Sequence, residues 1–185
     1  MRRKTVSRLF ACLLAVMPFM TAAGQTTDNI SLSDKLNYDR LPGFISITEL
    51  SGGPGIRLTD APYARYYFGI TSVAGYQFTR NLTAGGGTGL HFHNEGTLLP
   101  LFLDARFSLN ANDFVPYFGA AGGVAFNLSD PESRTWIFIN PSIGIRWVAA
   151  DRRSVSFSAG LMTMSGEVNR NSFINFKLGL GIKGR

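Results

Sequence analysis

Apolar and polar residues alternate with a period of two through most of the chain after position 42. The alternation is clearest over 66–79, where Tyr66, Phe68 and Ile70 begin an apolar face and Gly69 and Thr71 begin the opposite face. A β-strand points successive side chains to opposite sides, whereas a helix repeats every 3.6 residues. The pattern therefore predicts a chain built from strands.

Clusters of Gly, Asn, Asp and Pro divide this region into eight segments of about ten residues each. The predicted strands are 43–51, 66–79, 82–93, 97–109, 115–127, 135–148, 154–164 and 174–183. The first is the weakest, because its two faces are less distinct. We predict an all-β fold, an antiparallel up-and-down barrel of about eight strands.

The face opposite the large apolar residues is rich in small side chains, which suit the inside of a narrow barrel. The segment 82–93 places Thr83, Gly85, Gly87 and Gly89 in one row. Aromatic residues lie near strand ends, as in the two girdles of a membrane barrel; they are Tyr66, Phe68, Tyr76 and Phe78. Since a strand in hydrocarbon cannot leave its backbone groups unpaired, a membrane sheet must close. We therefore predict a transmembrane barrel.

The N-terminal residues have the pattern of an export signal. Four positive residues precede an apolar run over 9–20, and small residues follow at 21–24; the positive residues are Arg2, Arg3, Lys4 and Arg8. This order is typical of a cleaved signal peptide. An uncleaved anchor is the alternative, but the apolar run is short for a membrane helix. The predicted organisation is a signal at 1–24, a periplasmic leader at 25–41 and an outer-membrane barrel at 42–183.

Removal of the signal changes the charge argument. The formal net charge of +6 falls to about +2 when four positive residues leave with the signal. The remaining Lys and Arg are scattered, so we expect no nucleic-acid partner. The single cysteine, Cys12, lies in the signal, so a cysteine-free barrel has neither disulfides nor thiolate metal sites.

The connections between strands alternate in length. The first, third, fifth and seventh span 52–65, 94–96, 128–134 and 165–171, and the others span 80–81, 110–114 and 149–152. Short turns at one end and longer loops at the other are typical of outer-membrane barrels, and an even strand number places both chain ends in the periplasm. Asn140-Pro141 inside a strand predicts a bulge or kink, because Pro donates no ladder bond.

Several segments resemble a known family. They are Tyr66-Tyr67-Phe68-Gly69-Ile70, Gly75-Tyr76-Gln77-Phe78, Pro100-Leu101-Phe102-Leu103-Asp104-Ala105-Arg106 and Phe173-Ile174-Asn175-Phe176-Lys177-Leu178-Gly179. They look like the small outer-membrane β-barrel proteins common in Bacteroidetes, which in turn resemble the membrane domains of OmpA and OmpX. The resemblance covers roughly 42–183 and implies no catalytic residues. The aromatic residue that usually ends such barrels is missing here, where the chain closes with Ile182-Lys183-Gly184-Arg185.

The inward face of the predicted barrel carries charged residues. They are Asp104, Arg106, Arg146, Lys177 and Lys183. Because eight strands leave only enough interior for side chains, we expect a buried polar network in which the charges are paired. The alternative is a narrow ion path, which the same side chains would obstruct.

Two segments resemble known kinds of site only weakly. His91, His93 and Glu95 share one strand face and could contribute to a zinc site, although a polar rim at the strand end explains them more simply. Gly85-Gly86-Gly87 is no phosphate loop, since it lacks the Lys-Ser/Thr that such a loop needs. The residue two after His91 is a second histidine and not the serine of the lipid A deacylase pattern. We expect no catalytic residues and no cofactor.

The sequence thus predicts a non-enzymatic protein of the bacterial outer membrane that serves envelope integrity or surface-loop interactions. Its expected partners are outer-membrane lipid and the barrel assembly machinery, and we expect a monomer. Two alternatives remain open at this point. One is a soluble lipocalin-like ligand-binding barrel, in which the apolar faces would point inward. The other is a small porin or a lipid-modifying outer-membrane enzyme.

Overall fold

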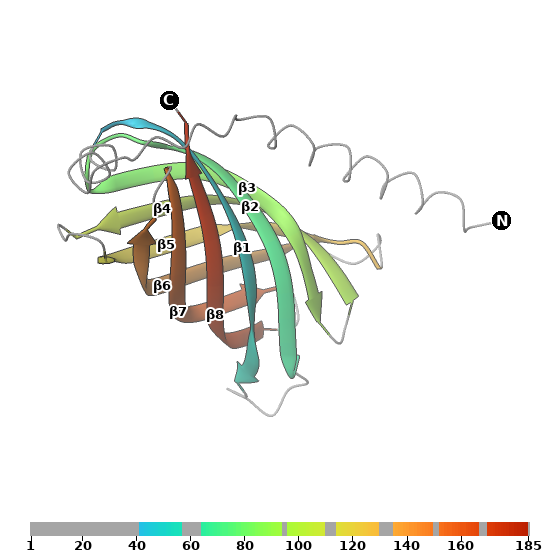
Figure 1. Ribbon diagram of the computed structural model, residues 1–185. Helices are drawn as coiled ribbons and strands as arrows, with labels where there is room; N and C mark the ends of the chain where they lie inside the picture. Colours follow the sequence, from blue (N-terminus) through green and yellow to red (C-terminus); the bar gives the residue numbers. More distant parts are fainter. Residues whose placement is uncertain are drawn as a thin grey trace.

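The structure, a computed structural model, describes residues 41–56, 64–93, 96–109, 114–129, 135–149, 152–166 and 170–184. These residues form one closed barrel in which each strand pairs with its neighbours in sequence and β8 pairs with β1 (Figure 1). The strands are β1 (Gly43–Ile56), β2 (Tyr66–Gln77), β3 (Leu82–His93), β4 (Gly96–Ser108), β5 (Phe114–Asn127), β6 (Trp136–Val148), β7 (Arg153–Ser165) and β8 (Arg170–Lys183).

All eight pairings are antiparallel, so the predicted eight-stranded up-and-down barrel is confirmed. The predicted signal, and the predicted leader except for Leu41, lie outside the described residues. Among the residues that are described, no helix is long and apolar enough to cross a membrane. We call the end where β1 begins and β8 finishes the terminal end, and the opposite end the loop end.

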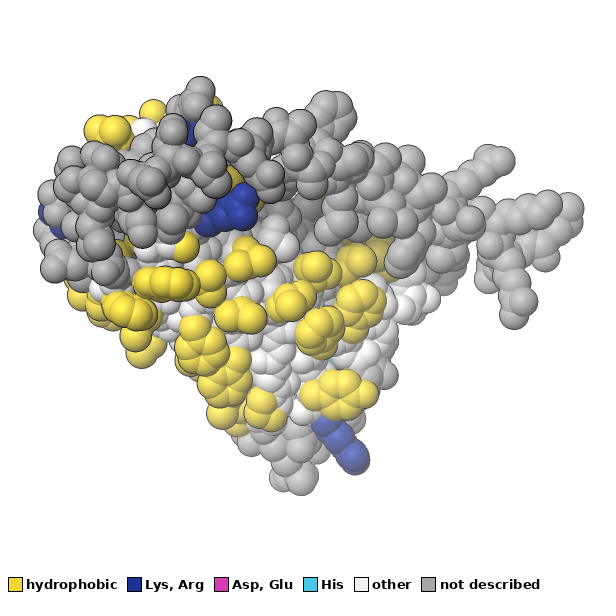
Figure 2. Space-filling view, viewed as in Figure 1, with side chains coloured by type: hydrophobic (Ala, Val, Ile, Leu, Met, Phe, Trp, Pro, Cys, Tyr) yellow, Lys and Arg dark blue, Asp and Glu magenta, His cyan; other side chains and the backbone are white. Residues whose placement is uncertain are grey.

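Large apolar side chains cover the outside of the barrel. Figure 2 shows them spread over the visible face between the strands' two ends. They include Phe44, Leu50, Phe68, Leu101, Leu103, Phe118, Ile139, Ile143, Phe157, Leu161 and Leu180. The alternative of a soluble lipocalin-like calyx is wrong, because Ile174, Phe176 and Leu178 would have to point inward and all three are exposed.

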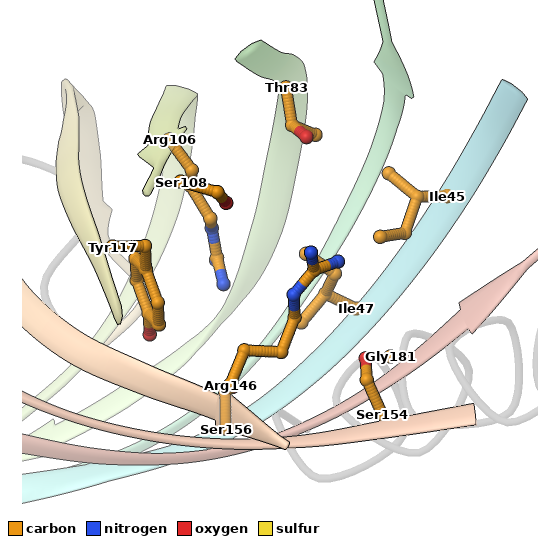
Figure 3. Close-up of a pocket in the computed structure, with 10 residues that line it drawn as sticks. All are labelled: Ile45, Ile47, Thr83, Arg106, Ser108, Tyr117, Arg146, Ser154, Ser156 and Gly181. Carbon is orange, nitrogen blue, oxygen red and sulfur yellow. The ribbon is translucent and has the colours of Figure 1, made fainter. Parts of the chain in front are cut away.

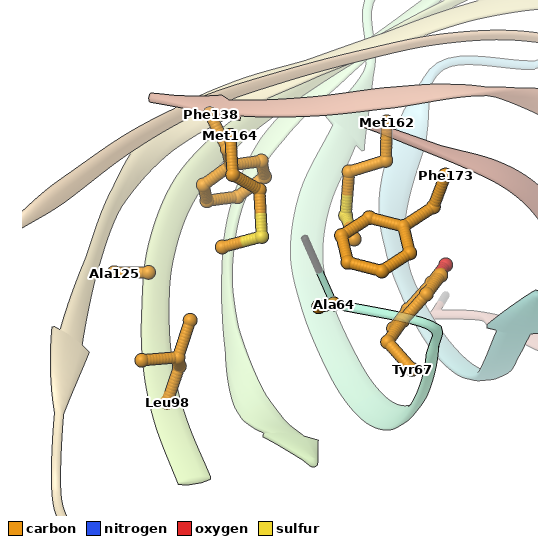
Figure 4. Close-up of a cluster of buried hydrophobic side chains, with 8 residues drawn as sticks. All are labelled: Ala64, Tyr67, Leu98, Ala125, Phe138, Met162, Met164 and Phe173. Carbon is orange, nitrogen blue, oxygen red and sulfur yellow. The ribbon is translucent and has the colours of Figure 1, made fainter. Parts of the chain in front are cut away.

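The lumen is divided into two halves of different character. At the loop end, buried apolar side chains from six strands, together with Ala64 just before β2, pack against one another (Figure 4). This loop-end cluster consists of Ala64, Tyr67, Leu98, Ala125, Phe138, Met162, Met164 and Phe173. Charged and hydroxyl side chains gather nearer the terminal end, together with a small apolar group of Ile45, Ile47 and Val73. The sequence predicts small side chains on the inward face, which holds for β3 but not for the loop end.

Four prolines lie inside the strands, and three of them interrupt a ladder without shifting its register. The ladder between β6 and β7 is interrupted beside Pro141, yet Ile139↔Thr163 and Ser142↔Gly160 keep the same alignment on either side. The same kind of interruption lies beside Pro100 between β3 and β4, and beside Pro54 between β1 and β8. A proline has no N–H for the ladder, so each ladder loses pairs locally. No extra residue is inserted, and the bulge predicted at Asn140-Pro141 is therefore absent.

Strand β1 is longer than predicted. The sequence assigned 52–56 to a loop because Gly52-Gly53-Pro54-Gly55 looks like turn chemistry. In the structure these residues extend the strand, and Gly52 pairs with Phe68 on one side and with Phe176 on the other. The glycines are explained by close backbone approach: a Cβ on Gly53 would overlap the carbonyl oxygen of Ile174. Gly96, also assigned to a loop, begins β4.

This close approach makes Gly53 a sensitive position. We expect Gly53→Ala to lower the free energy of unfolding by about 1–3 kcal/mol, because the backbone of β8 must move to admit the methyl group. The matched control is Gly86→Ala, where the new Cβ would meet nothing closer than the Phe102 carbonyl oxygen at 3.8 Å. Urea titrations of the two variants in lipid vesicles measure the difference, and equal midpoints would contradict the proposed overlap.

Candidate functional site in the barrel lumen

A buried ion cluster joins β1 and β4 across the interior. Arg106 Nε lies 2.7 Å from Asp104 Oδ1, and its Nη2 lies 3.3 Å from Asp104 Oδ2. The same Nη2 lies 3.1 Å from Glu49 Oε1. All three residues are buried. One guanidinium therefore bridges two carboxylates, which gives the charge-assisted, two-point contacts that suit its planar geometry.

The strand period explains how this cluster forms. Asp104 and Arg106 are two residues apart on β4, so both face inward and their side chains contact each other. The Arg106 guanidinium also lies over an aromatic ring of β5, with its central carbon 5.7 Å from the centre of the Tyr117 ring. Glu49 was not among the predicted site residues. The only indication in the sequence is that Glu49 is an acidic residue between Ile47 and Ser51 on the inward face of β1, a strand whose alternation is indistinct.

The other predicted lumen charges lie at three different places. Lys177 on β8 is buried within electrostatic range of Glu49 and Asp104. Lys183, near the terminal end, donates from Nζ to Gln77 Oε1 at 3.0 Å and to the Leu41 carbonyl oxygen. Arg146 on β6 is partly buried and points into the interior, toward Arg106 (Figure 3). All five predicted residues thus face the lumen, but Lys183 lies apart from the Glu49–Asp104–Arg106 cluster.

The loop-end cluster contains a polar contact that the sequence did not reveal. The Tyr67 hydroxyl donates to Asn175 Oδ1, and both residues are buried. The Tyr67 ring also meets the rings of Phe173 and His91 edge-on, with centroids 5.0 and 5.7 Å apart. A contact between β2 and β8 requires closure of the barrel, so no local sequence pattern could have identified it.

The Tyr67 contact gives a direct test of interior packing. We expect Tyr67→Phe to lower the free energy of unfolding by about 1–3 kcal/mol, because Asn175 keeps a buried acceptor without its donor. Tyr66→Phe is the control, since Tyr66 immediately precedes Tyr67 in β2 and faces outward. Both are measured by urea titration in vesicles, and a Tyr67→Phe variant as stable as the control would count against the buried contact.

The candidate metal residues are only partly described. His91 is buried and faces inward, with its ring edge-on to Phe138 at 6.2 Å, and His93 follows two residues later. Glu95 lies outside the described residues. Within the described ranges, no three His, Cys, Asp or Glu side chains are grouped so that they could hold a metal ion. The structure therefore places His91 in an aromatic environment beneath the loop end.

The fold is shared with solved β-barrel structures. The chain is similar to Neisserial surface protein A, with 16% identity over 77% of this chain and 97% of that one, and a TM-score of 0.55. It is also similar to the outer membrane protein OprG from Pseudomonas aeruginosa, with 11% identity, coverage of 79% and 97%, and a TM-score of 0.49. The N-terminal β-barrel domain of Pseudomonas aeruginosa OprF gives 15% identity, coverage of 77% and 100%, and a TM-score of 0.46.

No protein-family model matches the sequence, and no curated protein matches it significantly. At identities this low, the likeness to Neisserial surface protein A is a likeness of fold, because one fold can host many functions.

Proposed function

We propose that the chain is a non-enzymatic β-barrel of the bacterial outer membrane, of the small kind common in Bacteroidetes. The observation that carries this proposal is the distribution of side chains between the two faces. The outside presents a continuous set of large apolar residues, whereas the inside holds Glu49, Asp104, Arg106 and Lys177. Water would penalise the first arrangement, while lipid stabilises it. The export pattern at residues 2–24 supports the same location.

Fractionation tests the location. A tagged chain expressed in a Gram-negative host is expected in the outer-membrane fraction, and its migration on gels should change on heating because a closed barrel resists unfolding. Recovery as a soluble periplasmic protein would overturn the proposal. The Leu103→Arg variant is the control for the role of the outer face in membrane insertion. It places a charge on that face without touching the lumen.

We propose a role in envelope integrity or in presentation of the loop end. Conduction of ions through the lumen, as in a small porin, is the second candidate function. The loop-end cluster fills the interior with Leu98, Phe138, Met162 and Phe173, each almost without exposed surface. Planar bilayers containing the purified protein should therefore show no stepwise ion conductance. Regular single-channel steps that survive a change of detergent would favour the small porin.

The two roles within the proposal can be separated genetically. A strain lacking the protein is tested for leakage of a large antibiotic, and is then complemented with the wild-type chain or with a variant whose 57–63 and 130–134 segments are replaced by short Gly-Ser links. Rescue by both chains favours envelope integrity, because only the barrel is then needed. Rescue by the wild type alone favours interactions through those two segments. An unchanged lipid A mass on expression is expected, and a mass shift would favour the enzyme alternative.

A further inference from the structure

An open groove lies on the outer face of the barrel at its terminal end. It has a volume of about 580 Å³ and runs from β8 across β1 and β2 to β3. Its large outward-facing side chains are Phe44, Tyr76 and Ile182, and the rings of the first two meet edge-on with centroids 5.1 Å apart. None of the described residues that line the groove is charged. The groove therefore offers an apolar surface to whatever surrounds the barrel.

Small residues on neighbouring strands explain the recess. Ser46 pairs with Ala74 between β1 and β2, and Ala84 pairs with Tyr76 between β2 and β3. The outward positions of β6 carry isoleucines instead, among them the exposed Ile143. The outer face is thus lower over β1–β3 than over β6.

A recess in a surface that meets hydrocarbon favours a lipid chain as its occupant. Small residues let a neighbouring molecule approach the sheet backbone closely. A chain lying in the groove contacts protein on more than one side, whereas a chain on a flat part of the barrel has contacts on one side only. The lipid in the groove should therefore exchange more slowly than the rest of the lipid shell.

A basic side chain lies at the β8 border of the groove. Arg153 is exposed and pairs with Ile182 in the β7–β8 ladder, so their Cβ atoms lie about 5 Å apart on the same face. A guanidinium near the end of the apolar layer extends toward the headgroups and binds phosphate through paired hydrogen bonds. In the described part of the chain the acids are Glu49 and Asp104, and both are buried in the lumen, so neither reaches this border.

We propose that the groove binds one anionic phospholipid, whose acyl chain lies against Ser46 and Ala74 and whose phosphate contacts Arg153. The lipid comes from the inner leaflet, because the terminal end faces the periplasm in the proposed outer-membrane location, on which this inference rests. A zwitterionic phospholipid has the same chains and phosphate but carries a compensating positive charge, so it should bind less tightly.

Native mass spectrometry of the protein extracted from outer membranes tests the site. After delipidation in nonionic detergent, the protein is titrated with phosphatidylglycerol or with phosphatidylcholine of identical acyl chains. We expect one phosphatidylglycerol per barrel, bound about fivefold more tightly than phosphatidylcholine, which is the effect of one basic residue near a headgroup. Equal affinities for the two lipids would overturn the proposal, as would barrel dimers that persist without lipid and are lost in Ala74→Leu.

Two pairs of variants separate the groove from the headgroup contact. Ala74→Leu fills the groove and should remove the one-lipid peak for both lipids, whereas Ala120→Leu, on the exposed outer face of β5, should leave it unchanged. Arg153→Gln should weaken phosphatidylglycerol binding about fivefold without changing phosphatidylcholine binding. Arg170→Gln, exposed at the loop end of β8, should change neither. If either test variant matches its control, the proposal is wrong.

The location and the lipid site fail in different ways. The heat-dependent gel shift of each sample shows that the barrel is folded, and fractionation shows where the protein came from. Absence of the wild-type protein from the outer-membrane fraction would refute the location itself. A folded barrel from that fraction that binds both lipids equally would refute the lipid site alone.

Discussion

An arginine in place of Leu103 is expected to lower the free energy of unfolding in a lipid bilayer by about 2–4 kcal/mol. Leu103 is 75% exposed and lies in the middle of β4, where it pairs with Gly86 on β3 and Gly122 on β5. If the outside of the barrel faces hydrocarbon, a guanidinium there loses its water and has no acceptor in reach. The measurement is a urea titration of protein refolded into vesicles, followed by tryptophan fluorescence and by the gel shift.

The matched control for this variant is Leu109→Arg. Leu109 is also exposed but follows β4 at the terminal end, where its N–H donates to the Pro116 carbonyl oxygen. A charge near the membrane interface should cost only about 0–1 kcal/mol. The same loss in both variants would indicate a general effect of arginine on folding, and no loss in either would mean that β4 does not face lipid.

Replacing Arg106 by methionine should have an effect of similar or larger size. The variant leaves Glu49 and Asp104 inside the barrel without the guanidinium that bridges them. Removal of one member of a buried charge cluster typically costs about 3–5 kcal/mol. We expect the variant to refold poorly in vesicles, with the heat-modifiable band reduced or absent and a lower urea midpoint in the fraction that folds.

A compensated variant identifies the cause. When Glu49→Gln and Asp104→Asn accompany Arg106→Met, the two uncompensated charges are gone, and most of the lost stability should return. The single variants Glu49→Gln and Asp104→Asn show how the effect divides between the two contacts. If the triple variant is no more stable than Arg106→Met alone, the guanidinium contributes through packing against Tyr117 and not through its charge.

The fold could be predicted because a membrane barrel repeats one simple rule in every strand. Alternation alone assigned the inward and outward faces of β2, β3 and β8, since each residue's orientation depends only on its parity. The alternation pattern fails where the residues on both faces of a strand are small, because the two faces then look alike. The small residues of 52–56 looked like a loop, and only the approach of Ile174 from β8 explains why glycine is used at position 53.

The site was less accessible from sequence, for a physical reason. Parity shows that Asp104 and Arg106 face the lumen, but it does not show which side chain meets them from across the barrel. The identity of that partner depends on the registers of all eight strand pairs, and these registers cannot be read from any single segment. Glu49 was therefore missed as the second carboxylate, and so was the pairing of Tyr67 with Asn175. The apolar filling of the loop end was missed for the same reason, because all of its members except Ala64 come from six separate strands.

The central claim is that the large apolar side chains of this barrel meet lipid and not a core. Neighbouring positions 102 and 103 test it at one depth, because Phe102 points inward to Phe138, with ring centroids 5.9 Å apart, and Leu103 points outward. A single tryptophan is placed at either position after Trp136 and Trp147 are changed to phenylalanine, and the protein is refolded into vesicles of brominated phosphatidylcholine. Strong quenching of the tryptophan at 103 and weak quenching at 102 is the predicted result. Quenching at 102 with none at 103, or at neither position, would contradict the claim.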